Sequence, residues 1–293
     1  MMIFQPIKHE FVRRLIAALL LTGATAACSN SEEAAMKKGA EAQQQLNAGQ
    51  IAAARISIQE AIDERDDIPV LQLLRGRIEY ASGSPTNAFN AYSVALSLDA
   101  ANMEALQGVA QFGLQTGNIR EAEDAAQRIL GLNPTDTNGL TVQGLVQVVR
   151  KQTKKAIATS DKILAIKPND EAATILKARA LFLDGQGNEA LGYLNELVGK
   201  AGMTQGLSMT MLEIYRENGD KANMLVQFDY LRKERPQDLT LRIDEANTLY
   251  KTGDAQRARA VLHAALSKTP PDIKQSRQLV WLFREYDRSP FSD

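Results

Sequence analysis

The sequence contains almost none of the side chains on which metal sites and nucleophilic catalysis depend. Its 293 residues include a single cysteine and two histidines. Zinc sites of histidine and cysteine, Cys–His nucleophiles and Ser-His-Asp triads need more of these residues than the chain supplies. Glycine-rich phosphate-binding motifs are also absent. We therefore predict no catalytic residues, no metal site and no cofactor. An enzyme that works with carboxylates alone is the remaining enzymatic alternative.

Aromatic residues are scarce, at 5% of the chain, and the formal net charge is only −1. Proteins that bind nucleic acids usually combine a strongly basic face with aromatic side chains on which bases stack. Neither feature is present, so we predict that the protein does not bind nucleic acid. A short basic stretch at residues 150–155 could meet an anionic lipid or an acidic partner, although a solvated turn is the simpler interpretation.

Long hydrophobic runs are missing as well. The apolar stretch of residues 15–21 is too short to cross a bilayer as a helix. It follows Lys8, Arg13 and Arg14 and precedes small residues, which is the order of regions in a secretory signal peptide. We therefore predict that residues 1–27 form a signal peptide and that residues 28–34 form a short polar tether.

The residues around the only cysteine resemble the lipobox of bacterial lipoproteins. Thr25, Ala26 and Ala27 precede Cys28. The resemblance implies that Cys28 is lipidated and holds the chain at a membrane through a lipid anchor. Ser29 at the next position implies, by the same resemblance, an outer-membrane lipoprotein that faces the periplasm. The alternative is an ordinary secretory signal followed by an unrelated cysteine.

A 34-residue pattern repeats seven times without a gap over residues 35–272. The units start at Ala35, Pro69, Met103, Thr137, Glu171, Gln205 and Leu239. In the unit at Met103, two apolar stripes of helical spacing are separated by Thr116, Gly117 and Asn118, which predicts a pair of helices with a tight turn. Positions 8 and 20 of the unit are small in six of the seven units, and position 15 is glycine in six. Small residues let two antiparallel helices approach closely, and glycine supplies the backbone freedom of the turn.

This period and these residue types resemble the tetratricopeptide repeat, or TPR. The resemblance implies an all-α, right-handed TPR solenoid of seven helix-turn-helix repeats. Residues 273–293 match the first helix of an eighth unit and then stop, so we predict a capping helix and tail. This helix is not polar all round, so we predict that its apolar surface binds either a second copy of the chain, by self-association, or another partner.

Two units depart from the pattern. The unit at Thr137 has Lys151 where the others have the turn glycine. The unit at Gln205 has Leu212 and Met224 at the two small positions. Larger side chains at the crossing should push the helices apart, and repacking around the flexible methionine is a simpler interpretation than a ligand site.

In proteins with this repeat, the first helices line a concave groove that binds peptides. Carried over by position, the resemblance implies a peptide-binding groove formed by Arg77, Tyr80, Gln111, Arg179, Phe182, Arg216, Tyr250 and Trp281. Neighbouring groove positions hold Gln107, Gln115, Asn138 and Thr141. Aromatic and arginine side chains beside amides suit an extended, partly acidic peptide. The alternative is that these are ordinary surface residues without a particular ligand.

Together these features predict a non-enzymatic scaffold lipoprotein that mediates protein–protein interactions in an envelope assembly or export machine. The resemblance to TPR lipoproteins suggests exopolysaccharide export or pilus and secretion assembly as the setting. The alternative function is an adaptor that delivers substrates to an envelope protease or peptidoglycan hydrolase.

Overall fold

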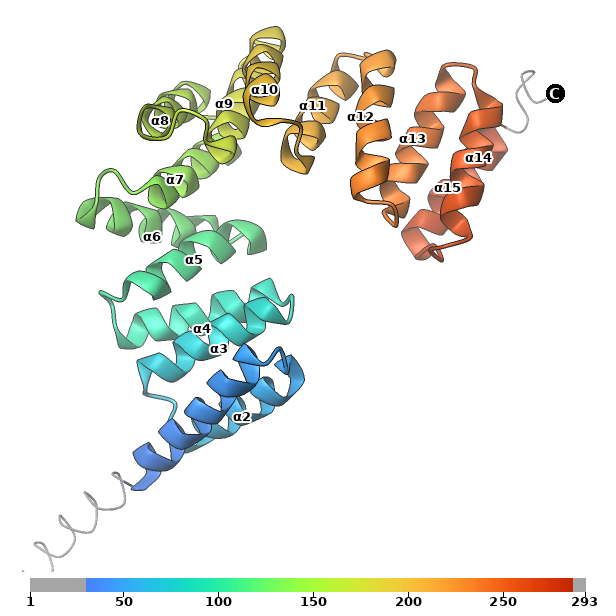
Figure 1. Cartoon of the computed structure of the whole chain (residues 1–293). Coiled ribbons are helices and arrows are strands. Elements are labelled where there is room, and N and C mark those ends of the chain that lie inside the picture. Colours follow the sequence, from blue (N-terminus) through green and yellow to red (C-terminus); the bar gives the residue numbers. More distant parts are fainter. Residues whose placement is uncertain (1–29, 287–293) are drawn as a thin grey trace, which may run out of the picture. The chain divides into compact units, whose positions relative to one another are not determined.

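The computed structural model describes residues 30–286, and every regular element in this range is a helix (Figure 1). The all-α class predicted from the sequence is therefore confirmed. The predicted signal peptide, Cys28 and the end of the tail beyond residue 286 lie outside the described residues. Within the described range, no helix is long and apolar enough to cross a membrane.

The helices alternate between two series that recur at a constant interval. Residues 30–47 are helical and precede α2. The first helices of the following pairs are α3 (Pro69–Ala81), α5 (Met103–Thr116), α7 (Thr137–Val149), α9 (Glu171–Leu183), α11 (Gln205–Glu217) and α13 (Leu239–Lys251). The second helices are α2 (Ile51–Glu64), α4 (Pro85–Leu98), α6 (Ile119–Leu132), α8 (Thr153–Ile166), α10 (Gly187–Ala201), α12 (Lys221–Glu234) and α14 (Ala255–Leu266). The last helix is α15 (Ile273–Tyr286). Successive starts within each series are 34 residues apart.

Five first helices, α5, α7, α9, α11 and α13, begin at a side chain that satisfies a free backbone N–H group of the first turn, whereas α3 begins at Ile68 without such a bond. Asn102, Asp136, Asp170, Thr204 and Asp238 each accept a hydrogen bond from the backbone N–H three residues later. Such a cap typically stabilises a helix by about 1 kcal/mol. In these five helices the cap lies at the residue before the unit, so they start at the same position of the repeat.

The turn between the two helices of a pair uses a left-handed backbone residue. Six glycines occupy it with φ values from 69° to 87°: Gly49, Gly83, Gly117, Gly185, Gly219 and Gly253. Lys151 occupies the equivalent place with φ 57°, and it is the only non-glycine residue with positive φ in the described range. A side chain with a Cβ atom strains this conformation, which explains why glycine recurs there.

We expect Lys151→Gly to raise the free energy of unfolding by about 0.5–1 kcal/mol, because the left-handed strain of about 1–2 kcal/mol exceeds the entropic cost of glycine. Chemical denaturation followed by circular dichroism measures the change. Gly117→Ala is the matched control, because an added Cβ would touch nothing within 4 Å there and the cost is that of the backbone alone. It should lower stability by about 1 kcal/mol. A destabilised Lys151→Gly variant would contradict the assignment of strain.

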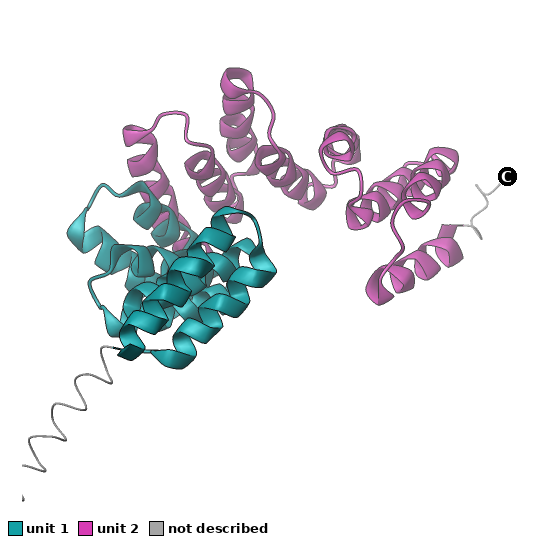
Figure 2. Cartoon of the chain, turned by 60° about the horizontal axis from the view of Figure 1, so that its bottom comes forward, with its two compact units in different colours: residues 1–146 teal, residues 147–293 magenta. Residues whose placement is uncertain are grey.

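The helices form two compact units, which we describe separately (Figure 2). The first unit ends at Val146 and the second begins at Gln147, so the boundary falls within α7. In the first unit, one apolar cluster surrounds Ile58 and Ile78, and another surrounds Leu106 and Ile129.

The core of the first unit shows why small residues recur at the helix crossings. The ring of Tyr92 on α4 lies between Gly76 on α3 and Gly108 on α5, and a Cβ atom at either glycine would overlap that ring. Burial raises the pKa of Tyr92 to about 12. At Gly113, an added Cβ would lie 3.0 Å from the Cβ of Ala122, so α5 and α6 also cross closely. The small residues therefore make room both for a neighbouring backbone and for an aromatic ring.

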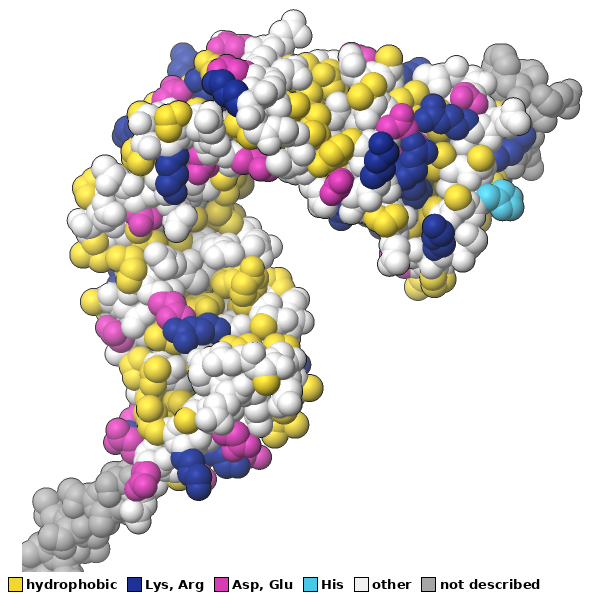
Figure 3. All heavy atoms as spheres, viewed as in Figure 1, with side chains coloured by type: hydrophobic (Ala, Val, Ile, Leu, Met, Phe, Trp, Pro, Cys, Tyr) yellow, Lys and Arg dark blue, Asp and Glu magenta, His cyan; other side chains and the backbone are white. Residues whose placement is uncertain are grey.

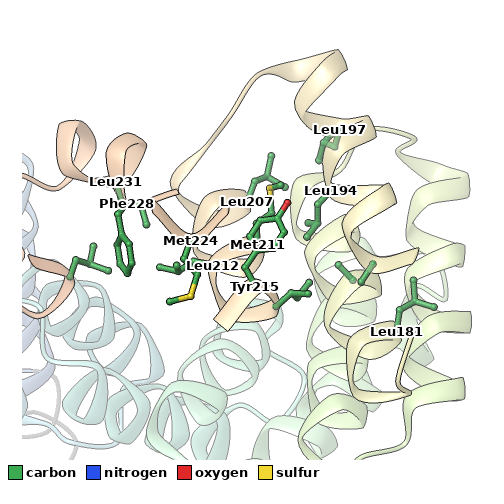
Figure 4. Packing of buried hydrophobic residues seen from close by; sticks show 14 residues of the cluster. Leu181, Leu194, Leu197, Leu207, Met211, Leu212, Tyr215, Met224, Phe228 and Leu231 are labelled. Carbon is green, nitrogen blue, oxygen red and sulfur yellow. The ribbon is translucent and has the colours of Figure 1, made fainter. Parts of the chain in front are cut away.

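The second unit contains the pair of helices with the two large residues. Leu212 on α11 and Met224 on α12 are both buried, in a cluster that includes Phe228 and Leu231 (Figure 4). The larger side chains thus lie in a packed apolar core. This arrangement supports the interpretation of local repacking over that of a ligand site. A further cluster around Leu249 and Leu262 joins α13, α14 and α15.

Candidate functional site

All eight predicted groove residues lie on first helices or on α15, and they are divided between the two units. Arg77, Tyr80 and Gln111 belong to the first unit. Arg179, Phe182, Arg216, Tyr250 and Trp281 belong to the second. We call the surface formed by these helices within each unit its first-helix face. These residues differ in exposure and in ion pairing, and both properties determine which of them can contact a partner.

In the first unit, the structure brings five of the predicted groove positions into one depression between α5 and α7. Its volume is about 370 Å³, and its polar wall consists of Gln107, Gln111, Gln115, Asn138 and Thr141. Its apolar floor consists of Ala110, Leu114, Ile129, Val142 and Leu145. Side-chain amides both donate and accept hydrogen bonds, so they can pair with the N–H and C=O groups of an extended backbone. We call this depression the amide groove.

The arginine of the first unit is already paired. Arg77 Nε donates to Glu104 Oε1 at 2.6 Å, and a second bond joins the same two side chains. This bidentate pair raises the pKa of the Arg77 guanidinium. Tyr80 nearby is 59% exposed, and its ring lies 5.2 Å from that of Phe112. Tyr80 is thus an accessible aromatic contact, whereas Arg77 would have to leave Glu104 to bind an acidic ligand.

The arginines of the second unit also lie within ion-pair distance of carboxylates, but neither forms the bidentate pair of Arg77. Arg179 Nε lies 3.7 Å from Glu213 Oε2, and Arg216 Nη2 donates to Asp244 Oδ2 at 2.9 Å. Burial raises the pKa of Asp244 against the opposing effect of Arg216. Each cation of the predicted groove therefore faces a carboxylate of the next repeat. The pairing weakens the expectation that an acidic peptide is attracted along these first helices.

Of the predicted groove residues, Trp281 lies on α15, and Tyr250 on α13 is covered by α15. Tyr250 is only 7% exposed, because its ring stacks on that of Tyr286 with centroids 4.5 Å apart. The prediction that Tyr250 lines an open groove therefore differs from the structure. Trp281 is 52% exposed, as is Val280 beside it, and Ile273 is 77% exposed. The self-association predicted for this helix stays a prediction.

Phe182 is also less accessible than expected, since it is half-buried and packs against the cluster of the second unit.

No group of three or more metal-ligating side chains occurs among residues 30–286.

The sequence reasoning missed a buried charged cluster in the second unit. Arg242 is 2% exposed and Glu245 is 0% exposed on α13. Glu245 Oε2 lies 3.0 Å from Arg242 Nη1, and its Oε1 lies 3.0 Å from Arg232 Nη1. Burial raises the pKa of Glu245 and lowers that of the Arg242 guanidinium.

The signal for this cluster is present in the repeat itself. Arg242 and Glu245 are at positions 4 and 7 of their unit, where the unit at Met103 has the buried residues Leu106 and Val109. Charged residues are rare at buried positions of a repeat unit unless they are paired. A comparison of each position across the units would therefore have found the pair.

Comparison with protein families supports the repeat assignment. The family model described as tetratricopeptide repeat matches residues 40–105. The search of curated proteins found no match.

Solved structures share the fold over most of the chain. A tetratricopeptide repeat protein from Parabacteroides merdae is 18% identical, with a TM-score of 0.70 over 86% of this chain and 99% of its own. PilW, described as a widely conserved type IV pilus biogenesis factor, is 19% identical, with a TM-score of 0.55 over 69% of this chain and 94% of its own. PilF of Pseudomonas aeruginosa is 16% identical, with a TM-score of 0.51 over 79% of this chain and 99% of its own. The fold is therefore that of a tetratricopeptide-repeat solenoid, and residues 40–105 carry the family's sequence pattern.

Proposed function

We propose that the protein is an envelope-anchored scaffold that holds protein partners on its first-helix faces. Tetratricopeptide-repeat domains generally act as non-enzymatic scaffolds for protein interactions. The observation that carries the proposal is the amide groove, where five polar side chains face an apolar floor in a space of about 370 Å³. Such a groove suits an extended peptide, whose backbone pairs with amides while an apolar side chain covers the floor.

The setting that we propose is an assembly or export machine of the cell envelope, of the exopolysaccharide or pilus and secretion type. Two solved structures with the same fold are PilW, described as a pilus biogenesis factor, and PilF. The proposed signal peptide and lipid anchor at Cys28 would place the repeats in the periplasm, at the outer membrane. The proposal predicts capture of machine components, whereas capture of a protease or peptidoglycan hydrolase would favour the adaptor function.

The first-helix face of the first unit can be tested with Gln111→Ala, in the amide groove, and with Tyr80→Ala, on α3, both at exposed side chains. Each should weaken partner binding by about 1–2 kcal/mol if it contributes a central contact, measured by titration calorimetry with the captured partner. Lys154→Ala and Lys155→Ala, at the start of α8, are the controls, because both side chains are exposed and outside the groove. Loss of binding from the lysine changes alone would move the binding site to the basic turn.

The anchor has a separate test. We expect the wild-type protein to fractionate with membranes and to incorporate a palmitate label, because two or more acyl chains give stable membrane attachment. Cys28→Ser should abolish both the label and the membrane association. A label that persists in Cys28→Ser would show that the chain is not lipidated at this residue.

A further inference from the structure

A positively charged pocket lies on the second unit, between the second helices α12 and α14. Its volume is about 430 Å³. The cationic wall is formed by Arg232, Arg242, Arg257 and Lys268, and the apolar wall by Pro236, Ala260, Val261, Ala264 and Ala265. Lysine and arginine side chains gather on the surface over α12–α14 (Figure 3). We call this depression the cationic pocket.

The carboxylates around the cationic pocket do not balance its cations. Asp229 pairs with Arg232 and with Arg257, the latter at 3.0 Å, and Glu245 lies between Arg232 and Arg242. Two carboxylates thus pair with three arginines, and Lys268 adds a fourth cation to the lining. Asp238 is nearby, but it pairs with Arg235 at 2.8 Å. The pocket therefore carries a net positive charge that an anion would neutralise.

Arg242 adds an observation that points to a ligand. Its side chain is buried and lines the pocket, yet its Nε, Nη1 and Nη2 atoms have no hydrogen-bond partner. Glu245 Oε2 lies within ion-pair distance of Nη1 but is not aligned for a hydrogen bond. Buried donors without partners are costly, so an acceptor placed in the pocket would relieve that cost. A guanidinium group is also well shaped to bind a carboxylate through two parallel hydrogen bonds.

The equivalent depression in the first unit shows that this charge is not a general property of the repeat. Between α4 and α6, the lining includes Arg120 and Arg128 together with Glu121 and Asp124. Glu121 has the same position in its unit as Arg257. A depression between successive second helices therefore results from the repeat fold itself. Its positive charge in the second unit results from the particular residues of α12–α14.

We propose that the cationic pocket binds a carboxylate group of an acidic peptide segment in a partner protein, with an adjacent apolar side chain against Val261 and Ala264. The volume and the apolar wall favour this ligand over a small, fully hydrated anion, which would fill little of the space and leave the apolar wall exposed. Apart from Arg242 on α13, the lining residues lie on the second helices α12 and α14 or just after them, so the site goes beyond the first-helix faces. The peptide test does not involve the amide groove, so a negative result would not count against the proposed function.

The test uses the full-length protein and a short fluorescein-labelled peptide in which glutamates alternate with leucines. A matched peptide has glutamine in place of each glutamate. We expect the glutamate peptide to bind at least about tenfold more tightly, because charge pairing and the leucine contacts act together. Arg257→Glu and Lys268→Glu should each remove most of that difference, and both change exposed side chains. Arg120→Glu in the first unit is the matched control and should leave binding unchanged.

Ligands of the cationic pocket other than an acidic peptide would give different results in this test. Inorganic phosphate that displaces the peptide at equal concentration would show a general anion site and would overturn the proposal. Binding of phosphatidylglycerol vesicles that is lost in Lys268→Glu, without peptide binding, would assign the surface to a membrane instead. Equal binding of the two peptides, or equal effects of Arg120→Glu and Arg257→Glu, would also overturn it. Circular dichroism of each variant establishes that the helices are intact.

Discussion

Replacing Glu245 by alanine should lower the free energy of unfolding by about 3–5 kcal/mol, because it leaves the buried Arg242 charge without its partner. Arg242 is 2% exposed, so little water would reach its guanidinium in place of the lost carboxylate. The expected readout is faster amide exchange in α13 together with a lower denaturation midpoint. This is the largest single effect that the structure leads us to expect.

A double variant is the control for that prediction. Arg242→Leu with Glu245→Val introduces side chains like those of Leu106 and Val109, which occupy the same positions in the unit at Met103. Replacement of a whole buried ion pair by apolar residues is often neutral or stabilising by about 1–4 kcal/mol. We therefore expect the double variant to be at least as stable as the wild type. If both variants lose stability equally, the site is sensitive to shape and the account of unpaired charge is wrong.

The second large effect is expected from Ala122→Leu in the first unit. Ala122 is fully buried, and its Cβ faces Gly113 across the crossing of α5 and α6. The added carbons have no space, so overpacking should cost about 1–3 kcal/mol in the free energy of unfolding. Chemical denaturation followed by circular dichroism measures the loss.

Met224→Leu is the matched substitution, because Met224 occupies the position of Ala122 in the unit at Gln205. Its surroundings already accommodate a long side chain in a packed cluster. An exchange of methionine for leucine conserves volume and should cost less than about 1.5 kcal/mol. Equal and large losses at both sites would show that the positions are not equivalent.

The helical repeat was predictable because its causes act locally. The turn between paired helices needs a left-handed residue, so glycine marks it at a constant interval, and Lys151 still adopts the same backbone conformation. The small residues at the crossings likewise mark a close approach of paired helices, and they recur in six of the seven units. Such constraints leave a signal at fixed positions of the sequence.

The candidate site was less predictable because it depends on contacts between side chains of neighbouring repeats. Groove positions carried over from the repeat family predicted that Gln111 and Asn138 line a groove, and both line one depression in the structure. It could not show that Arg77 pairs with Glu104, since that contact depends on the rotamers of two long side chains. It also could not show that Tyr286 covers Tyr250, because the docking of α15 depends on tertiary packing.

The central claim is that partners bind the first-helix faces, and site-specific photo-crosslinking in living cells tests it most directly. A benzophenone amino acid would replace Tyr80 or Gln111 on the first-helix face of the first unit, and Val94 on the second helix α4 as the control. All three side chains are exposed. The account predicts a crosslink to the same envelope protein from both first-helix positions and none from the control. Crosslinks from Val94 alone would contradict it.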